Sequence, residues 1–276
     1  MNNLIKLSLK ELKSHNIPNP DLDLRILLNF SSKSKKKIFL SNFNYTDIDL
    51  HKFHSILDRR LKFEPISKII NKKNFWKYDF YVDHHVLDPR PETELIIEES
   101  LKLLTKKNKK INILDLGTGS GCLAVCLAKE FINSKITAID ISTKAMKVAS
   151  KNFNLHKCNN IITKRICAVE SVSEKFDLIV SNPPYLSKKD YQKTSGEIKK
   201  YEPKNAFFGG NDGLFFYRKF AREVPKLMKS DSYLILEIGE KQASNCITLF
   251  CNSGLNFVKK AKDLQKKDRI LIFSKL

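Results

Sequence analysis

The fold is decided by the stretch "INILDLGTGSGCLAVCLAKEF", residues 111–131. A short apolar run, 111–116, runs into three glycines spaced G-x-G-x-G, and a second apolar segment follows at once. The first segment has the length of a buried strand and the second that of a helix. A strand that turns into a helix through glycines indicates an α/β domain with a ligand at the turn.

The segments downstream repeat this alternation. Strands are predicted at 135–140, 160–166, 176–182, 232–239 and 268–275, and helices at 120–131, 143–155, 213–228 and 240–251. Strands that alternate with helices favour a doubly wound, mostly parallel sheet. We therefore predict an α/β fold of the Rossmann-like class from about residue 93 to 276.

The region before this domain has a different pattern. Residues 1–72 predict a small domain of short helices, with one starting at Pro20-Asp21. Another helix carries Leu50, Phe53, Leu57 and Leu61, and we expect Thr46 to be its N-cap. Aromatic residues at 75, 78 and 80 predict a β-hairpin within a linker, 73–92, and a helix is expected from residue 93 to 104.

Composition limits the function classes. The chain has 276 residues, 42% hydrophobic and 29% charged, and no apolar run reaches the ~18–20 residues that span a bilayer. The first twenty residues are too polar for a secretory signal, so we expect a cytoplasmic protein with no membrane contact. We expect a monomer. The six cysteines show no metal-ligand spacing, so neither a disulfide framework nor a metal site is predicted.

The net charge of +20 leaves a nucleic-acid partner open. Only eight of the 50 basic residues are Arg, however, and an excess of Lys also fits a lysine-favouring genome or an acidic protein partner. Direct nucleic-acid binding is therefore possible but not required.

The glycine loop and the next strand end predict a cofactor site. Gly117, Thr118, Gly119, Ser120 and Gly121 form the turn, and Cys122 stands where a dinucleotide fingerprint has its third glycine. Asp140 ends the following strand, where a carboxylate can accept both hydroxyls of a ribose. A plain tight turn and, for Asp140, a helix cap are the alternatives. Together the two features favour an adenosine-containing cofactor without a pyrophosphate, which suits S-adenosylmethionine (SAM).

A second loop, Asn182-Pro183-Pro184-Tyr185, follows the strand 176–181. Two prolines stop the sheet, and residues before proline are held extended, so the loop is rigid. The Asn182 side-chain oxygen and the Pro183 carbonyl are fixed acceptors and Tyr185 offers a flat face, which describes a site for a planar –NH2 group. The substrate could be a carboxamide or an exocyclic base amine, and positioning would supply much of the catalysis. The adjacent His84 and His85 are interpreted as a surface pair.

These motifs resemble an N-specific, SAM-dependent methyltransferase. The segments 59–70, "VLDPRPETE" (86–94), 197–220, "LILEIGEKQ" (234–242) and "KDRILIF" (267–273) are similar to the release factor glutamine methyltransferases. The resemblance implies methyl transfer from SAM to the glutamine side-chain nitrogen of the Gly-Gly-Gln motif in peptide-chain release factors, with S-adenosylhomocysteine as product. It also implies that the helical domain and hairpin help dock the release factor.

The resemblance implies roles for single residues as well. The loop 117–121 would wrap the methionine part of SAM, Asp140 would hold its ribose, and Asn182 would bridge cofactor and substrate. Pro183 would accept from the substrate amide through its carbonyl, while Pro184 and Tyr185 complete the substrate site, with Tyr185 packing the glutamine.

The chain departs from the family pattern at a few positions. Cys167-Ala168 replaces an acidic residue and a bulky one at the adenine site, where either backbone contacts suffice or Glu170 is a candidate substitute in a shifted register. Asp88 replaces an apolar residue and Asn71 a glycine. The main alternative is an adenine-N6 methyltransferase acting on DNA or RNA, which would want a target-recognition region rich in Arg and aromatic residues for base flipping. Arg is rare in this chain and the sequence shows no such insertion. A catalytically inactive ribosome- or RNA-binding module is the third interpretation, and the intact motifs argue against it.

Overall fold

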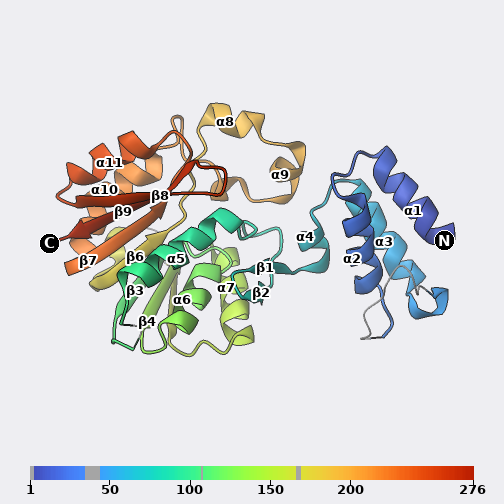
Figure 1. Ribbon diagram of the computed structural model, residues 1–276, viewed down its shortest axis with the longest axis horizontal. Helices are drawn as coiled ribbons and strands as arrows, with labels where there is room; N and C mark the ends of the chain where they lie inside the picture. Colours follow the sequence, from blue (N-terminus) through green and yellow to red (C-terminus); the bar gives the residue numbers. More distant parts are fainter. Residues whose placement is uncertain (1–2, 35–43, 107, 166–168) are drawn as a thin grey trace. The chain divides into compact units, whose positions relative to one another are not determined.

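The computed structural model describes residues 3–34, 44–106, 108–165 and 169–276. Its contacts divide the chain into two compact units, one of residues 1–72 with 196–201 and one of residues 73–195 with 202–276 (Figure 1). The three-part domain division made from the sequence stays a prediction about how the chain folds.

The first unit is helical. It contains α1 (Asn3–Ser14), α2 (Pro20–Phe30), α3 (Leu50–Leu61), α4 (Ile66–Ile70) and α9 (Gly196–Tyr201), with a 3-10 turn at Tyr45–Asp47. Apolar residues at helical spacing on α1, α2 and α3 form its core, which includes the fully buried Leu12, Leu27 and Phe53. Pro20 occupies the first turn of α2, as predicted.

The predicted N-cap of α3 was wrong by three residues. Asp49, not Thr46, caps this helix, because its Oδ1 accepts the backbone N–H of Lys52 at 3.0 Å. Thr46 lies in the preceding 3-10 turn. An N-cap binds an N–H two or three residues ahead, and the apolar stripe that begins with Leu50 requires a cap directly before it.

The second unit is built on a seven-stranded sheet in the order β5-β4-β3-β6-β7-β9-β8. The strands are β3 (Asn112–Leu116), β4 (Lys135–Asp140), β5 (Ile161–Arg165), β6 (Phe176–Ser181), β7 (Met228–Glu237), β8 (Asn256–Lys262) and β9 (Asp268–Lys275). The first five in that spatial order are parallel, and β9 runs antiparallel to both β7 and β8. The prediction of a mostly parallel α/β sheet is confirmed.

Helices pack on both faces of this sheet, as Figure 1 shows. One core contains side chains of α5 (Glu94–Leu103), α6 (Cys122–Glu130) and α7 (Thr143–Leu155) and includes Ile113 and Leu178 of the strands. The other contains side chains of α10 (Phe215–Leu227) and α11 (Ala243–Cys251) and includes Leu114 and Ile179. Successive strand residues point to opposite faces, so consecutive apolar residues bury into both cores. The doubly wound prediction is thus confirmed.

The hairpin is also confirmed, and one strand was missed. Strands β1 (Lys73–Phe75) and β2 (Tyr78–Phe80) pair antiparallel, and Phe75 and Phe80 are buried against α6 and α7 in the first sheet core. The edge strand β8 was not predicted, because its sequence NFVKKAK is mostly exposed and lacks an apolar run. Lysines on an edge strand are a known means of discouraging further strand pairing.

Candidate active site

A cavity of about 260 Å³ lies at the carboxyl ends of the central strands. Strand β3 has β4 on one side and β6 on the other, so the chain reverses its direction of winding there. Ligands of doubly wound sheets bind at such a switch point. The wall includes the glycine loop after β3, the turn after β4 and the loop after β6, together with residues 85–90, Thr93 and part of α10.

The glycine loop needs its glycines for two separate reasons. Gly117, Gly119 and Gly121 have φ angles of +82°, +54° and +82°, which side chains other than that of glycine rarely adopt. A Cβ at Gly117 would meet no atom within 4 Å, whereas a Cβ at Gly121 would lie 2.6 Å from the Phe153 ring. Gly117 and Gly119 therefore present bare backbone at their own positions in the cavity wall, and Gly121 lets α6 approach α7.

Asp115 lies behind this loop and braces it. Its side chain is 1% exposed, and its Oδ2 accepts the Thr118 hydroxyl at 2.6 Å. Burial raises the pKa of Asp115 to about 7, against the lowering effect of the Thr118 hydrogen bond. Asp115 thus stabilises the shape of the loop from inside.

Asp140 does line the cavity. Its Oδ2 accepts the N–H of Gly119 at 3.0 Å and its Oδ1 accepts the N–H of Ser142 at 2.8 Å. Burial raises its pKa, and these backbone hydrogen bonds act in the opposite direction. The cap of α7 is Ser142, whose Oγ accepts the Ala145 N–H at 3.1 Å, so the helix-cap alternative for Asp140 is wrong. Each Asp140 oxygen keeps lone-pair capacity for a hydroxyl donor.

Asn182, Pro183 and Pro184 form another part of the wall. The Asn182 amide nitrogen donates to the Thr93 hydroxyl at 2.9 Å. No residue in the described ranges donates to Asn182 Oδ1 or to the Pro183 carbonyl. The loop therefore offers two acceptors that the protein itself does not use.

Tyr185 lies outside the cavity wall. Its hydroxyl donates to Glu237 Oε1 at 3.3 Å, and its carbonyl accepts the Gln242 side-chain amide at 2.9 Å. Burial raises the Tyr185 pKa, and the negative charge of Glu237 raises it further. The flat face expected of Tyr185 stays a prediction.

Sequence reasoning missed Thr93, Glu237 and Gln242. Thr93 Oγ1 donates to Glu237 Oε2 at 2.6 Å. The Gln242 side-chain amide donates to the backbone carbonyls of both Tyr185 and Gly213. A usable signal did exist for Glu237. It ends strand β7 just as Asp115 and Asp140 stand at or near the ends of β3 and β4, and parallel strand ends share one edge.

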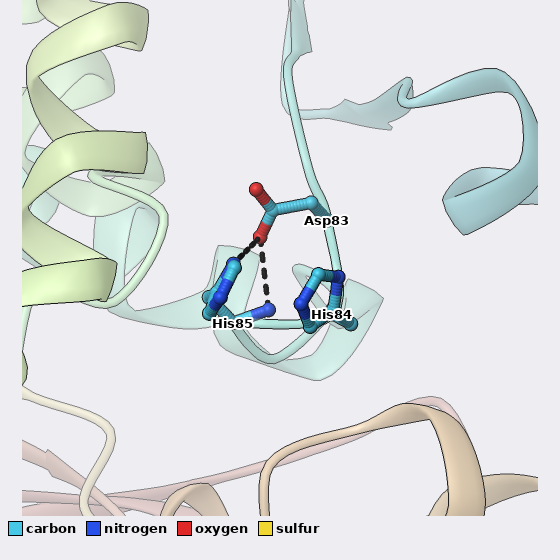
Figure 2. Close-up of side chains that lie close together, drawn as sticks. All are labelled: Asp83, His84 and His85. Carbon is cyan, nitrogen blue, oxygen red and sulfur yellow. Dashed lines mark hydrogen bonds and ion pairs between the residues drawn. The ribbon is translucent and has the colours of Figure 1, made fainter.

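The pair His84-His85 differs from a simple surface pair. Figure 2 shows the Asp83 carboxylate directed at His85, with Oδ1 accepting the His85 backbone N–H at 2.9 Å and lying 3.1 Å from its Nδ1. His84 is exposed and its ring lies 3.8 Å from that of His85, which itself reaches the cavity wall. Ligand atoms of the three residues lie within 4.8 Å of one another, so this turn carries side chains of metal-binding type.

The positions at which this chain differs from the family pattern can be located in the structure, with the exception of Cys167 and Ala168. Asn71 ends α4 at a φ of +53°, a left-handed conformation that explains why glycine suits this position. Cys167 and Ala168 lie outside the described residues. Glu170 forms ion pairs with Lys219 and Arg222. Its neighbour Val169 lies in the cavity wall, but Glu170 does not, so the structure does not support Glu170 as a substitute for the acidic residue of the adenine site.

The doubly wound sheet and the motifs around its switch point define a methyltransferase domain. The Methyltransferase small domain model matches residues 93–199, and the PrmC N-terminal domain model matches residues 3–70. The chain is 34% identical to the release factor glutamine methyltransferase of Buchnera aphidicola subsp. Baizongia pistaciae over 97% of this chain and 96% of that protein. The chain belongs to the release factor glutamine methyltransferase family.

Two further comparisons describe length and fold. A bifunctional methyltransferase of Rickettsia bellii is 34% identical over 96% of this chain, which spans about half (53%) of that relative's length. The hMettl16 catalytic domain, solved in complex with MAT2A 3'UTR hairpin 6, has 13% identity and a TM-score of 0.58 over 71% of this chain and 74% of that chain. This likeness concerns the fold alone. Among the described residues, no helix is both long and apolar enough to cross a membrane.

Proposed function

We propose that this chain transfers a methyl group from SAM to the side-chain amide nitrogen of the glutamine in the Gly-Gly-Gln motif of peptide-chain release factors. One observation carries the proposal. Asn182 Oδ1 and the Pro183 carbonyl are two acceptors without a donor among the described residues, on a proline-stiffened loop at the cavity. Two fixed acceptors match the two N–H bonds of a primary carboxamide.

The cavity suits the cofactor through its donor and acceptor pattern. Gly117 and Gly119 leave the wall open where a ligand can contact backbone, at the N-terminal end of α6. Asp140 offers carboxylate lone pairs to the two ribose hydroxyls, while Thr118, Ser120 and Gly121 complete the loop around the methionine part. Bound here, SAM would supply a methyl group on a sulfonium and leave as S-adenosylhomocysteine, while the substrate nitrogen would lose one of its two protons to solvent.

The Asn182 loop would act by positioning. When both N–H bonds of the substrate amide are held in one plane by Asn182 Oδ1 and the Pro183 carbonyl, the nitrogen lone-pair orbital points out of that plane. Well-oriented groups gain roughly 7–11 kcal/mol in intramolecular reactions. Pro184 and Tyr185 would line the glutamine side chain on the substrate side.

The partner assignment follows from the relatives. The family name specifies release factors, and we infer that the helical unit, which matches the PrmC N-terminal domain model, helps dock them. We further propose that the protein works as a monomer in the cytoplasm and needs no direct nucleic-acid contact.

The proposal is tested by incubating the chain with labelled SAM and, separately, purified release factor, duplex DNA and total RNA. Label is expected in the release factor alone. Label found only in nucleic acid would establish the adenine-N6 alternative instead. No label in any arm, together with no SAM binding by calorimetry, would support an inactive binding module.

An Asn182→Ala variant tests the positioning step. We expect transfer to fall to background while SAM binding stays measurable by calorimetry, since the glycine loop and Asp140 remain. Asn252→Ala, at an exposed helix end, is the matched control and should keep full activity. Near-normal turnover of Asn182→Ala would refute the role of the amide.

A further inference from the structure

A buried carboxylate, Glu237, lies behind the Asn182 loop: it contacts Tyr185 of the loop directly and reaches Asn182 through the Thr93 hydroxyl. Glu237 is 1% exposed, and its two oxygens accept the Thr93 hydroxyl at 2.6 Å and the Tyr185 hydroxyl at 3.3 Å. Thr93 in turn accepts the Asn182 amide nitrogen at 2.9 Å. None of these hydrogen bonds is required to form the sheet, and Thr93 does not use its hydroxyl to cap α5.

The sheet brings these groups together. Strands β6 and β7 are parallel neighbours, with Ser181 paired with Leu236. Asn182, the first residue after β6, and Glu237, the last of β7, follow this pair directly in the chain. Thr93 arrives from the 3-10 turn Pro91–Thr93 just before α5 and lies between the two side chains.

We propose that Glu237 is a positioning residue that fixes the orientation of the Asn182 amide through the Thr93 hydroxyl and holds the Tyr185 phenol directly. This inference rests on the proposed function, in which Asn182 Oδ1 accepts from the substrate amide. It adds two residues, Thr93 and Glu237, to the substrate-orienting machinery.

The orientation follows from counting hydrogens. An ionised carboxylate has no hydrogen to donate, so the single hydroxyl hydrogen of Thr93 is committed to Glu237. Thr93 then offers only a lone pair to Asn182, and the Asn182 atom at 2.9 Å must be the amide nitrogen. The two ends of an Asn amide are otherwise hard to distinguish. Here the ionised Glu237 dictates that Oδ1 points away from Thr93.

Protonation of Glu237 would reverse the orientation of the Asn182 amide. A protonated Glu237 can donate to Thr93, which frees the Thr93 hydrogen for Asn182 Oδ1. The Asn182 amide would then rotate and present its –NH2 group to the –NH2 group of the substrate, a pair of donors with no acceptor. The orienting form of Glu237 is therefore the ionised one.

The surroundings of Glu237 place this change near neutral pH. Burial raises its pKa to about 7, with a smaller contribution from Glu92, while the Thr93 and Tyr185 hydrogen bonds and Arg269 lower it. Arg269 is paired with Asp263 at 2.9 Å. The Tyr217 hydroxyl on α10 donates to the Glu237 backbone carbonyl. Activity should accordingly rise as the pH increases through about 7.

Steady-state kinetics with labelled SAM and release factor test the relay. For Thr93→Val, which removes the hydroxyl at nearly constant volume, we expect kcat to fall at least tenfold with the SAM Kd within threefold. Thr93→Ser should recover most of the lost rate. Thr248→Val, at an exposed hydroxyl on α11, is the matched control. A Thr93→Val variant with kcat within twofold of the parent would overturn the proposal.

The pH dependence of kcat distinguishes a positioning role of Glu237 from a purely structural one, because loss of a structural contact alone would not change this dependence. Glu237→Gln cannot accept from both Thr93 and Tyr185 and has no titrating proton, so we expect a lower kcat and loss of the rise through about pH 7. Glu240→Gln, on the exposed turn nearby, should keep the parental profile. An unchanged acid limb in Glu237→Gln would contradict the proposal.

A measurement without substrate separates this inference from the proposed function. Carboxyl ¹³C NMR on the free protein, with the Glu237 signal assigned by its loss in Glu237→Gln, should give a Glu237 pKa that rises in Thr93→Val and in Tyr185→Phe. If the parent does not methylate release factor, the proposed function fails while this titration still decides the relay. A Glu237 pKa unchanged in Thr93→Val would show that the hydroxyl does not act on the carboxylate.

Discussion

The backbone N–H of Gly119 donates to Asp140 Oδ2 at 3.0 Å, so the loop after β3 is joined to the end of β4 by a side chain. Asp140 contributes a second hydrogen bond, from Ser142, through its other oxygen. The residue proposed to bind the ribose therefore also holds the loop proposed to bind the methionine part. Loss of the carboxylate should affect both.

For Asp140→Ala, which loses two ribose hydrogen bonds, we expect SAM binding to weaken by about two to four orders of magnitude. Hydrogen bonds to a charged group contribute about 1.5–3 kcal/mol each, and a tenfold change in Kd corresponds to about 1.4 kcal/mol. Calorimetric titration with SAM measures the effect. Asp231→Asn, at an exposed position of β7 with φ of +55°, is the control and should bind SAM as the parent does. Equal affinities for Asp140→Ala and the parent would exclude the ribose role.

The loop that supports Tyr185 has no space for a side chain at Gly213. A Cβ there would lie 2.4 Å from the Tyr185 carbonyl, at a φ of +78°. Gly213→Ala should therefore destabilise the fold by about 2–4 kcal/mol, combining left-handed strain with overpacking, and should reduce methyl transfer. Gly254 has a similar φ of +87°, but a Cβ there would have no neighbour within 4 Å. Gly254→Ala therefore measures the cost of the left-handed backbone conformation without the steric overlap. Urea unfolding and the labelled-SAM assay compare the two, and equal losses in both variants would contradict the steric argument.

In the helical unit, Arg60 holds a buried carboxylate. Its Nε lies 2.7 Å from Asp23 Oδ2, and both residues are 6% exposed. Arg60→Ala would leave Asp23 buried without this partner, which typically costs about 3–5 kcal/mol. Arg59→Ala removes a pair that is part-exposed and worth roughly 0–1 kcal/mol.

Hydrogen exchange followed by mass spectrometry measures this effect in the unit itself. Peptides from α1, α2 and α3 should lose protection in Arg60→Ala and keep it in Arg59→Ala. Full protection in both variants would show that the Asp23 charge is accommodated without Arg60.

Asp115 should make stability depend on pH below neutrality. Its pKa is about 7 in the folded chain and near 3.8 when unfolded, so the folded state binds the proton more tightly. Stability from this group is then greatest at low pH and is lost as the pH rises from about 4 to 7. Asp115→Asn keeps an acceptor for Thr118 but cannot ionise. As the pH rises from 4 to 8, the free energy of unfolding of Asp115→Asn should increase relative to that of the parent by about 3–4 kcal/mol.

Urea unfolding at several pH values between 4 and 8 checks this prediction, with Asp231→Asn as the control. The difference in free energy of unfolding between Asp115→Asn and the parent should change with pH. A pH-independent difference would mean that Asp115 ionises normally in the folded state.

The sequence alone determined the order and type of most elements. Apolar runs at 135–140 and 268–275 coincide with β4 and β9, and the periodic segment 143–155 coincides with α7, because burial imposes these patterns on the residues themselves. It also located the glycine loop, Asp140 and the Asn182 loop, since glycine spacing and consecutive prolines limit the backbone locally. The exposed strand β8 lacked such a pattern and was missed.

Only the tertiary structure decided which side chains meet. Thr93 and Glu237 are 144 residues apart in the chain, and nothing local to either predicts a 2.6 Å hydrogen bond between them. Their contact depends on the register of β6 and β7 and on where α5 begins, which are properties of the packed sheet. The sequence thus determined that a rigid amide loop stands at the cofactor edge. The three-dimensional arrangement of Thr93 and Glu237 determined which way that amide points, because the direction of a hydrogen bond depends on partners that only folding brings together.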